Sequence, residues 1–478
     1  MKKETECLHA GYTPGNGDPR VMPIVQSTTY TFNSTEHIAD IFDDPTKGLI
    51  YSRFANPTCD AVEKKIAALE GGVAAMLTSS GQAASLLSIL NVCSSGDSFI
   101  ASSAIYGGTF NLFAVTMKKM GIEFTFVSPD STREELQAAF RPNTKAVFGE
   151  TIANPAICVF DIEKFANIAH KNGVPLIIDN TFATPINCRP FEWGADIVTH
   201  STTKYMDGHG AAVGGAIVDS GKFDWMAHAD KFPGLCTPDD SYHGITYAER
   251  FGKEGAFITK ATAQLMRDFG STPAPMNAWL LGMGMETLPL RMEKHCANAL
   301  AVAKFLQNHE KVAWVRYAGL PGDKYYELGQ KYLPKGCCGV VSFGVKGGRA
   351  AAEAFMGRLK IAAIETHVAD ARSCCLHPAT TTHRQLSSAD LAAIGIADNL
   401  IRLSVGIESA EDIFDRNPRK GVIEGDVIAF QNLLGYIKVP VKGEGKLQSV
   451  IVRTLCPTSS NFHPIAQAAT LDLSKNVS

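Results

Sequence analysis

The sequence has no excess of charge of one sign and no long apolar run. Its 478 residues include 45 Lys and Arg and 48 Asp and Glu, which gives a formal net charge of −3. The chain therefore lacks the basic excess that marks nucleic-acid-binding proteins. Its first residues, MKKETECLHAGYTPG, lack the apolar segment of a secretory signal, and no stretch reaches the length of a transmembrane helix. We expect a cytoplasmic protein that binds neither nucleic acid nor a membrane.

Cysteine is present but poorly placed for metal binding or cross-linking. The chain has 12 cysteines and no CxxC pair. The doublets Cys337–Cys338 and Cys374–Cys375 consist of adjacent residues, a poor geometry for chelating one metal or for an unstrained disulfide. His367, His377 and His383 lack the close helical spacing of a zinc site. We expect no metal site, and reduced cysteines that are mostly buried.

A glycine-rich dinucleotide fingerprint is also missing. No GxGxxG pattern follows a predicted strand, because the glycines between Gly208 and Gly215 have the wrong spacing. A nicotinamide-dependent dehydrogenase is therefore a poor explanation for the β–α pattern of this chain.

The order of apolar segments predicts an α/β protein. Hydrophobic residues make up 45% and charged residues 19% of the chain, as in ordinary globular proteins, and the length suffices for two domains. We expect an arm over 1–58, where turn formers are frequent, a large domain over 59–292 and a smaller α/β domain over 293–415. Residues 416–478 are expected to form an atypical tail that is disordered, loosely attached or produced by an altered reading frame.

Apolar runs alternate with helical periodicity in both expected domains. In the large domain the expected strands are 73–78, 99–101, 123–127, 146–150, 174–178 and 195–198, and the expected helices are 58–70, 83–90, 132–140 and 162–172. In the smaller domain the expected strands are 312–317, 339–345 and 400–405, and the expected helices are 291–306 and 349–359.

The stretch GADIVTHSTTKYMD, residues 194–207, holds the first candidate for chemistry. A buried strand leads into the hydroxyls of Ser201 and Thr203 and then to Lys204. Ligands of α/β sheets bind outside the carboxyl ends of the strands, which is where Lys204 lies. A lysine there can form a Schiff base with an aldehyde whose phosphate the hydroxyls hold. A single lysine after a strand is more often a solvated surface residue, so this interpretation depends on the residues around it.

Two further strand ends carry polar residues. Asp179 ends the apolar run PLIID, where an unpaired carboxylate is costly and needs a cationic partner. An ordinary salt bridge can satisfy it, but another strand end, 25 residues later, carries Lys204. After strand 73–78, a Ser/Gly turn leads into a helix at Gly81 and Gln82. The free backbone N–H groups of such a helix start bind anions, although Ser/Gly turns before helices are common.

Three aromatic or basic residues are weaker candidates. Tyr51 and Arg53 fall on one face of an extended segment and can clamp a phosphate, and an exposed arginine in an arm is an equally good explanation. Tyr106 follows strand 99–101, a position at which an aromatic ring more often serves packing than function.

These parts together make up a pyridoxal-phosphate site. From about residue 4 to 415 the chain resembles the Cys/Met-metabolism family of fold-type I pyridoxal-phosphate enzymes. The shared motifs are YSRFANPT, SSGQAA, YGGT, DNTFATP, STTKYMDGHG, GMETLPLRM, HPATTTH and RLSVGIE. The resemblance implies a large domain with a mostly parallel sheet, a smaller C-terminal α/β domain and an extended N-terminal arm.

Within this family, an insertion at about 219–272 and the segment 366–386 resemble the O-acetylhomoserine sulfhydrylase branch. The branch implies γ-replacement, in which O-acetyl-L-homoserine and sulfide or methanethiol give L-homocysteine or L-methionine and acetate in methionine and cysteine biosynthesis. Methionine γ-lyase and cystathionine γ-lyase or γ-synthase remain alternatives, as does a binding scaffold of the same fold without catalysis.

The resemblance also implies roles for single residues. Lys204 holds the cofactor and moves the substrate's protons, Asp179 keeps the pyridine nitrogen protonated, and Tyr106 stacks on the ring and assists at the γ-leaving group. The residues implied for the cofactor phosphate are Gly81, Gln82, Ser201 and Thr203, and those implied for the substrate are Arg402 and Asn154. Tyr51 and Arg53 are implied to reach the phosphate of a neighbouring subunit, in a tetramer built from active dimers.

Overall fold

The computed structural model describes residues 1–43, 47–382, 384, 391 and 396–414. These residues belong to one compact unit. The expected tail over 416–478 lies outside the described residues, as does His383 of the HPATTTH motif.

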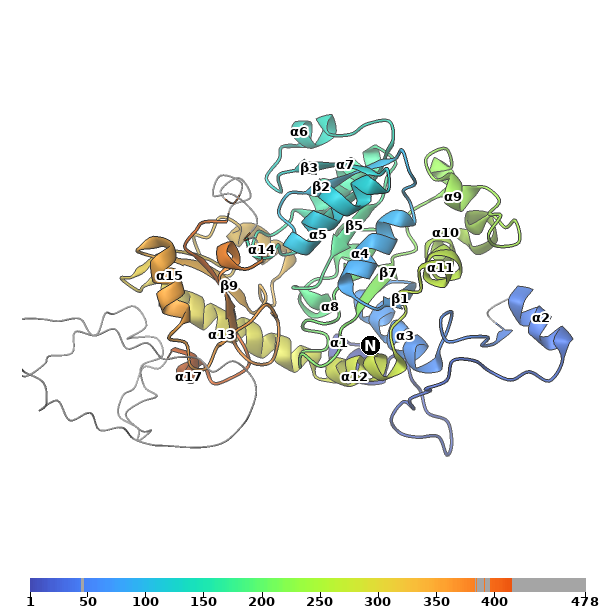
Figure 1. Ribbon diagram of the computed structural model, residues 1–478, viewed down its shortest axis with the longest axis horizontal. Coiled ribbons are helices and arrows are strands. Elements are labelled where there is room, and N and C mark those ends of the chain that lie inside the picture. Colours follow the sequence, from blue (N-terminus) through green and yellow to red (C-terminus); the bar gives the residue numbers. More distant parts are fainter. Residues whose placement is uncertain (44–46, 383, 385–390, 392–395, 415–478) are drawn as a thin grey trace, which may run out of the picture. The chain divides into compact units, whose positions relative to one another are not determined.

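The larger of two sheets has seven strands in the order β1-β7-β6-β5-β4-β2-β3 (Figure 1). The strands are β1 (Ala74–Thr78), β2 (Ser98–Ser102), β3 (Glu123–Val127), β4 (Thr144–Glu150), β5 (Leu176–Asp179), β6 (Ile197–His200) and β7 (Gly215–Asp219). The adjacent pairs β6-β5, β5-β4, β4-β2 and β2-β3 are parallel, whereas β7 pairs antiparallel with both β1 and β6. The predicted mostly parallel sheet is confirmed, and β7 is a strand that the sequence analysis did not predict.

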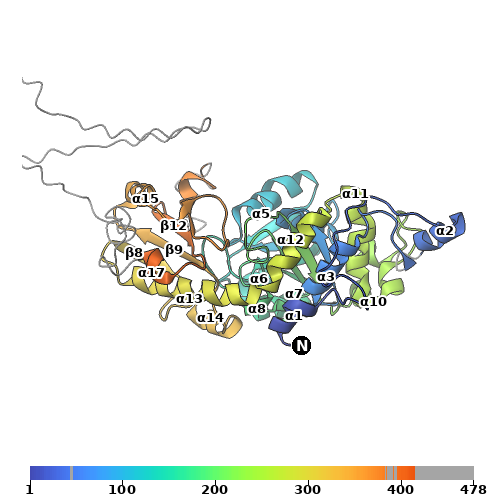
Figure 2. The same cartoon turned by 90° about the horizontal axis from the view of Figure 1, so that it is seen from below.

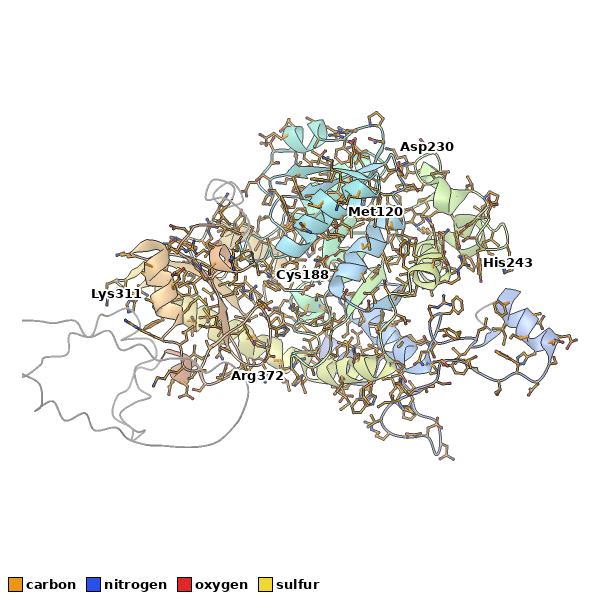
Figure 3. All side chains as sticks on the ribbon, in the orientation of Figure 1. Met120, Cys188, Asp230, His243, Lys311 and Arg372 are labelled. Atoms are coloured by element: carbon orange, nitrogen blue, oxygen red, sulfur yellow. The ribbon has the colours of Figure 1, made fainter. Side chains whose placement is uncertain are left out.

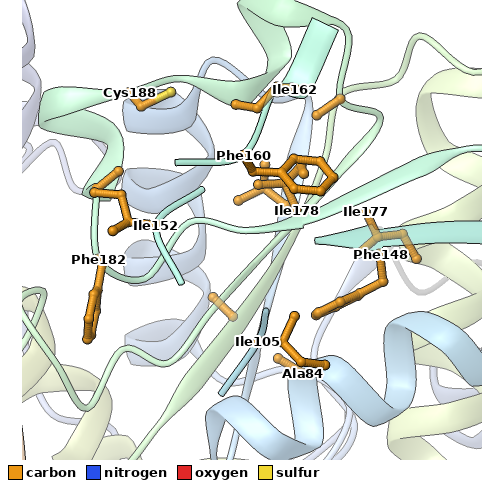
Figure 4. Packing of buried hydrophobic residues seen from close by; sticks show 14 of the residues in the cluster. Ala84, Ile105, Phe148, Ile152, Phe160, Ile162, Ile177, Ile178, Phe182 and Cys188 are labelled. Carbon is orange, nitrogen blue, oxygen red and sulfur yellow. The ribbon is translucent and has the colours of Figure 1, made fainter. Parts of the chain in front are cut away.

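Strands β2, β4, β6 and β7 are buried along their whole length, as the apolar middles of these strands require, whereas the edge strand β3 is partly exposed. The helices of this region are α3 (Pro57–Glu70), α4 (Gly81–Leu90), α5 (Gly107–Asn111), α6 (Arg133–Ala138), α7 (Ile162–Lys171) and α8 (Thr184–Asn187). Phe148 of β4 and Ile177 and Ile178 of β5 are fully buried in the core together with Ala84 of α4 (Figure 4). Burying each large apolar side chain stabilises the fold by about 1.5–3 kcal/mol, and this core fixes the strand ends that carry the site.

The expected insertion after β7 is largely helical. It contains η4 (Met226–His228), α9 (Pro233–Cys236), α10 (Tyr247–Lys260), η5 (Ala261–Met266) and α11 (Arg267–Phe269), and α10 packs on β1 and β7. Two further helices follow, α12 (Pro275–Glu286) and α13 (Leu288–Gln307). The expected domain boundary after residue 292 falls inside α13.

The smaller sheet has five strands in the order β10-β11-β12-β9-β8. Its elements are β8 (Val312–Arg316), α14 (Tyr326–Tyr332), β9 (Val340–Val345), α15 (Gly348–Met356), β10 (Ala363–Ile364), β11 (Cys374–Leu376), β12 (Leu400–Ser404) and α17 (Ala410–Phe414). The described residues contain eleven free cysteines, and all except Cys158 and Cys236 are buried. Among the described residues, no helix combines the length and the apolarity that crossing a membrane requires.

The N-terminal arm is extended over most of its length but contains two short helices that the sequence did not predict, α1 (Lys3–His9) and α2 (Thr35–Asp43). Helix α1 packs against α3, α12 and α13 (Figure 2). Its Cys7 is fully buried and accepts a 2.8 Å hydrogen bond from Lys65 through its carbonyl oxygen. Tertiary contacts therefore stabilise a helix that is too short to form alone.

Candidate active site

A cavity of about 210 Å³ opens at the carboxyl ends of β4, β5 and β6. Its wall combines these strand ends, the N-terminus of α4 and residues of the smaller sheet. The lining includes Ser80, Gly81, Gln82, Tyr106, Glu150, Asn154, Asp179, Thr181, Ser201, Thr203, Lys204, Thr366, Val368 and Arg402. The fold thus brings together nine of the eleven site residues that the sequence predicted.

Lys204 lies in the turn that follows β6 and points into the cavity. Its Nζ is 3.3 Å from Nδ1 of His367. Burial lowers the pKa of Lys204 to about 8, and the positive charge of Arg402 contributes in the same direction. A lysine with such a pKa has a substantial fraction of neutral, nucleophilic amine near neutral pH.

Asp179 ends β5 and faces the cavity without a cationic partner among the described residues. One carboxylate oxygen, Oδ1, accepts a 2.9 Å hydrogen bond from the backbone N–H of Thr181. Burial raises the pKa of Asp179, and the hydrogen bonds from Thr181 act in the opposite direction. The described residues thus do not supply the cationic partner that the sequence argument called for, and a bound ligand with a cationic group would supply it.

A second carboxylate, which the sequence analysis missed, lies beside Asp179. Glu150 ends β4, and its Cα pairs with that of Asp179 across the parallel ladder. Burial and the charge of Asp179 raise the pKa of Glu150 well above its ordinary value. The sequence contained a signal for it, because Glu150 ends the expected strand 146–150 (AVFGE) just as Asp179 ends PLIID.

Glu150 also holds two neighbours of the cavity through their backbones. Its Oε1 accepts a 2.6 Å hydrogen bond from the N–H of Tyr106, and its Oε2 accepts one of 3.2 Å from the N–H of Asn154. The Tyr106 side chain is 42% exposed, so its ring is available to a ligand in the cavity. The position of Tyr106 is thus set by a strand-end carboxylate.

The N-terminus of α4 forms an anion-binding wall. The Ser80 side chain accepts a hydrogen bond from the N–H of Ala83, which leaves the N–H groups of Gly81 and Gln82 without intrahelical acceptors. A Cβ on Gly81 would lie 2.5 Å from Cβ of Ser201, so only glycine allows these two segments to approach so closely. Oε1 of Gln82 is buried without a hydrogen-bond partner. On the same wall, Thr203 Oγ1 donates to the carbonyl oxygen of Gly214 at 3.1 Å.

Arg402 approaches the cavity from the smaller sheet. It lies in the middle of β12, is 3% exposed and has no carboxylate partner among the described residues. Its guanidinium donates to Oδ1 of Asn154 at 3.3 Å and to the carbonyl oxygens of Thr366 and His367, while its Nε has no partner. A buried guanidinium in this state is ready to bind a carboxylate.

Tyr51 and Arg53 do not line this cavity. The Arg53 guanidinium lies 5.4 Å from the centre of the Tyr51 ring and donates to the carbonyl oxygen of Arg267. Tyr51 is 40% exposed and forms an isolated bridge with Thr29 in the arm. Tyr51 and Arg53 are therefore neighbouring side chains, but they do not line the cavity of their own chain.

Comparison with known proteins places this geometry in a family. The model of the Cys/Met metabolism PLP-dependent enzymes matches residues 4–416. The chain belongs to this family.

Curated relatives of the family match the chain over nearly their whole length. An O-acetyl-L-homoserine sulfhydrylase from Leptospira meyeri is 44% identical over 86% of this chain and 95% of its own. One from Corynebacterium glutamicum is 46% identical over 86% and 94%, and a homocysteine synthase from Schizosaccharomyces pombe is 44% identical over 86% and 96%.

A solved structure of the family shows the same fold. It is a chain from Campylobacter jejuni assigned as an O-acetylhomoserine (thiol)-lyase, and it carries a pyridoxyl-lysine 5′-monophosphate. The TM-score is 0.83 at 37% identity, over 86% of this chain and 97% of the other. The predicted fold-type I architecture is confirmed.

The cofactor of this family, pyridoxal 5′-phosphate, fits the described cavity. The Lys204 amine, whose pKa is lowered, is available for the cofactor's aldehyde. The Asp179 carboxylate, which has no cationic partner among the described residues, is available for the pyridine nitrogen. The N-terminus of α4, with two free N–H groups, is available for the phosphate. In contrast, the described residues contain no group of three or more side chains that could hold a metal ion.

Proposed function

We propose that this chain catalyses the γ-replacement of O-acetyl-L-homoserine by sulfide or methanethiol, giving L-homocysteine or L-methionine and acetate. The observation that carries the proposal is that Lys204, Asp179 and the unpaired Arg402 line one cavity. The names of the relatives, O-acetyl-L-homoserine sulfhydrylase and homocysteine synthase, favour this reaction over the lyase reactions of the same family.

Bound pyridoxal 5′-phosphate supplies the electron sink for the negative charge that develops on the substrate carbons. Lys204 attaches the cofactor through its Nζ and, as the free amine, takes the proton from the substrate Cα. Asp179 holds the proton on the pyridine nitrogen, because a carboxylate favours the charged N–H form. The N–H groups of Gly81 and Gln82 bind the phosphate, together with the hydroxyls of Ser201 and Thr203.

The substrate is oriented from the other side of the cavity. Arg402 binds its α-carboxylate with the help of the Asn154 amide, which already contacts the guanidinium at 3.3 Å. Tyr106 would stack on the cofactor ring and assist proton transfer at the departing acetate. These interactions fix the substrate with its Cα–H bond toward Lys204.

Tyr51 and Arg53 act in the cavity of a second subunit in this proposal. Their distance from the cavity of their own chain and the exposure of Tyr51 support this arrangement. The active unit is then at least a dimer, and we expect a cytoplasmic tetramer built from such dimers.

Product analysis tests the reaction. The purified holoenzyme is incubated with O-acetyl-L-homoserine in the presence and absence of sulfide or methanethiol, and acetate, homocysteine, methionine, ammonia and 2-oxobutanoate are measured. We expect acetate release that depends on the thiol and matches the amount of homocysteine or methionine. Ammonia and 2-oxobutanoate in equal amounts without a thiol would show γ-elimination and contradict the proposal.

A further inference from the structure

A histidine from the smaller sheet touches the amine of Lys204. His367 lies in the loop between β10 and β11, and its Nδ1 is 3.3 Å from Nζ of Lys204. On its far side, Nε2 is buried without a hydrogen-bond partner and lies 4.0 Å from Oδ2 of Asp370. The imidazole is therefore placed between an amine and a carboxylate.

Asp370 is fixed as an anion. Its side chain is 4% exposed, and Oδ1 and Oδ2 accept hydrogen bonds of 2.8 and 2.9 Å from the guanidinium of Arg372. Arg372 is labelled in Figure 3, and its guanidinium also donates to the carbonyl oxygen of His209. A carboxylate held in this way favours the tautomer of His367 whose proton is on Nε2, and that tautomer leaves the Nδ1 lone pair for Lys204.

The backbone at His367 is held by the residue proposed to bind the substrate. Arg402 donates a 2.9 Å hydrogen bond to the carbonyl oxygen of His367, and the Cys374 thiol donates to the same atom. The imidazole is thus anchored to β12, while Lys204 is anchored to β6 of the larger sheet. The contact joins the two sheets at the reacting atom.

We propose that His367 is the proton partner of Lys204: its Nδ1 accepts a proton from the Lys204 ammonium, which returns Lys204 to the neutral amine. In this step the N–H bond at Nζ breaks, an N–H bond forms at Nδ1, and the positive charge moves to the imidazole facing Asp370. The reverse transfer returns the proton to Lys204. This role rests on the proposed function, in which the free amine of Lys204 removes a proton from the substrate.

The charges around His367 favour the neutral imidazole, which is the form that can accept a proton. Burial and the charge of Lys204 lower the pKa of His367, so the imidazole is neutral and its lone pair is available. The negative groups that act in the opposite direction are Asp370 and Glu365 of its own loop and Asp207 of the turn after Lys204.

The first test needs neither cofactor nor substrate. In the full chain without cofactor, labelled with ¹⁵N in its histidine rings, we expect one imidazole with its proton on Nε2, and a higher pKa for that imidazole in Lys204→Ala. The pKa rises there because the substitution removes the neighbouring positive charge. An imidazole titration that is unchanged by Lys204→Ala would overturn the proposal.

The second test separates proton transfer from positioning in the holoenzyme. In His367→Asn the amide oxygen can still accept a hydrogen bond from Lys204 but cannot take its proton. We expect exchange of the substrate Cα proton with D₂O, followed by NMR, to fall about 100-fold, as does kcat, with KM and cofactor affinity nearly unchanged. Free imidazole should restore exchange in His367→Gly, which it would not do if the residue served only to position Lys204.

His209→Asn is the matched control. His209 is exposed, lies near Arg372 and does not contact Lys204, so this variant should exchange at the wild-type rate. Exchange by His367→Asn at the wild-type rate would refute the role of His367. If the wild-type enzyme exchanges the Cα proton of amino acids but releases no acetate from O-acetyl-L-homoserine, the proposed function fails and the role of His367 is still tested.

Discussion

The strand ends of the larger sheet and the N-terminal arm both carry predicted site residues, but only the strand ends deliver them to the cavity. Asp179 ends β5 and Lys204 follows β6; these strands are neighbours in the sheet, and the ladder fixes where each strand stops. Tyr51 and Arg53 lie on a segment outside the two sheets, where Tyr51 forms an isolated bridge with Thr29 of the arm and Arg53 donates to the carbonyl oxygen of Arg267. Pairing between neighbouring strands therefore brings residues at the strand ends together within one chain. The position of residues on the arm depends instead on the surface against which the arm packs.

Removing the amine at the strand end should have the largest effect. In Lys204→Ala we expect the visible absorbance of the purified protein to disappear and turnover to fall by more than about 1000-fold, because no other amine lines the cavity among the described residues. Circular dichroism should show an intact fold. Lys222→Ala is the matched control, since Lys222 donates to the carbonyl oxygen of Phe191 away from the cavity.

Asp179→Asn tests the acid on the neighbouring strand. A carboxylate about 3 Å from a protonated pyridine nitrogen contributes on the order of 5 kcal/mol at an effective dielectric constant of about 20. The amide has the same shape but no charge, so we expect kcat to fall by about three orders of magnitude while the thermal midpoint changes little. A variant with more than a tenth of wild-type kcat would contradict the role of Asp179.

Glu150→Gln tests the protonation state of the second carboxyl group at the strand ends. Burial beside Asp179 raises the pKa of Glu150, so the folded protein binds a proton there that the unfolded chain releases. The resulting stability is present below the ordinary carboxyl pKa and is lost as pH rises toward the raised value, with a slope of up to about 1.4 kcal/mol per pH unit.

Denaturant unfolding of the cofactor-free protein at several pH values between 5 and 8 measures this effect. Wild type should lose stability relative to Glu150→Gln as pH rises. Parallel stability curves for the two proteins would show that Glu150 is ionised in the folded state.

Arg53→Ala tests the arm and should have the smallest effect. If Arg53 binds the phosphate of a neighbouring subunit, its removal weakens cofactor affinity by about tenfold, the value of one charge-assisted hydrogen bond. Equilibrium dialysis of pyridoxal 5′-phosphate measures this, with Arg250→Ala, on the helical insertion, as an arginine control. Full cofactor affinity in Arg53→Ala would rule out the arrangement in which arms are exchanged between subunits.

Local sequence determined which residues can carry chemistry. A carboxylate at the end of an almost wholly apolar strand is costly to bury without a partner, and this predicted Asp179. Lys204 was predicted from its position after a strand with hydroxyls before it, and Gly81 from a Ser/Gly turn that leads into a helix. Arg402, which the resemblance implied for substrate binding, is buried without a carboxylate partner among the described residues.

Tertiary structure alone decided which of these residues meet. The pairing of Glu150 with Asp179 depends on the order and register of β4 and β5, and the contact between Lys204 and His367 joins residues 163 apart in the chain. Asn154 and Arg402, which are 248 apart, meet because the smaller sheet packs over the strand ends of the larger one. Side-chain type and periodicity can be read from residues that are close in the sequence. Strand order and the packing between sheets are determined by the free energy of the whole fold, so a local sequence pattern does not reveal them.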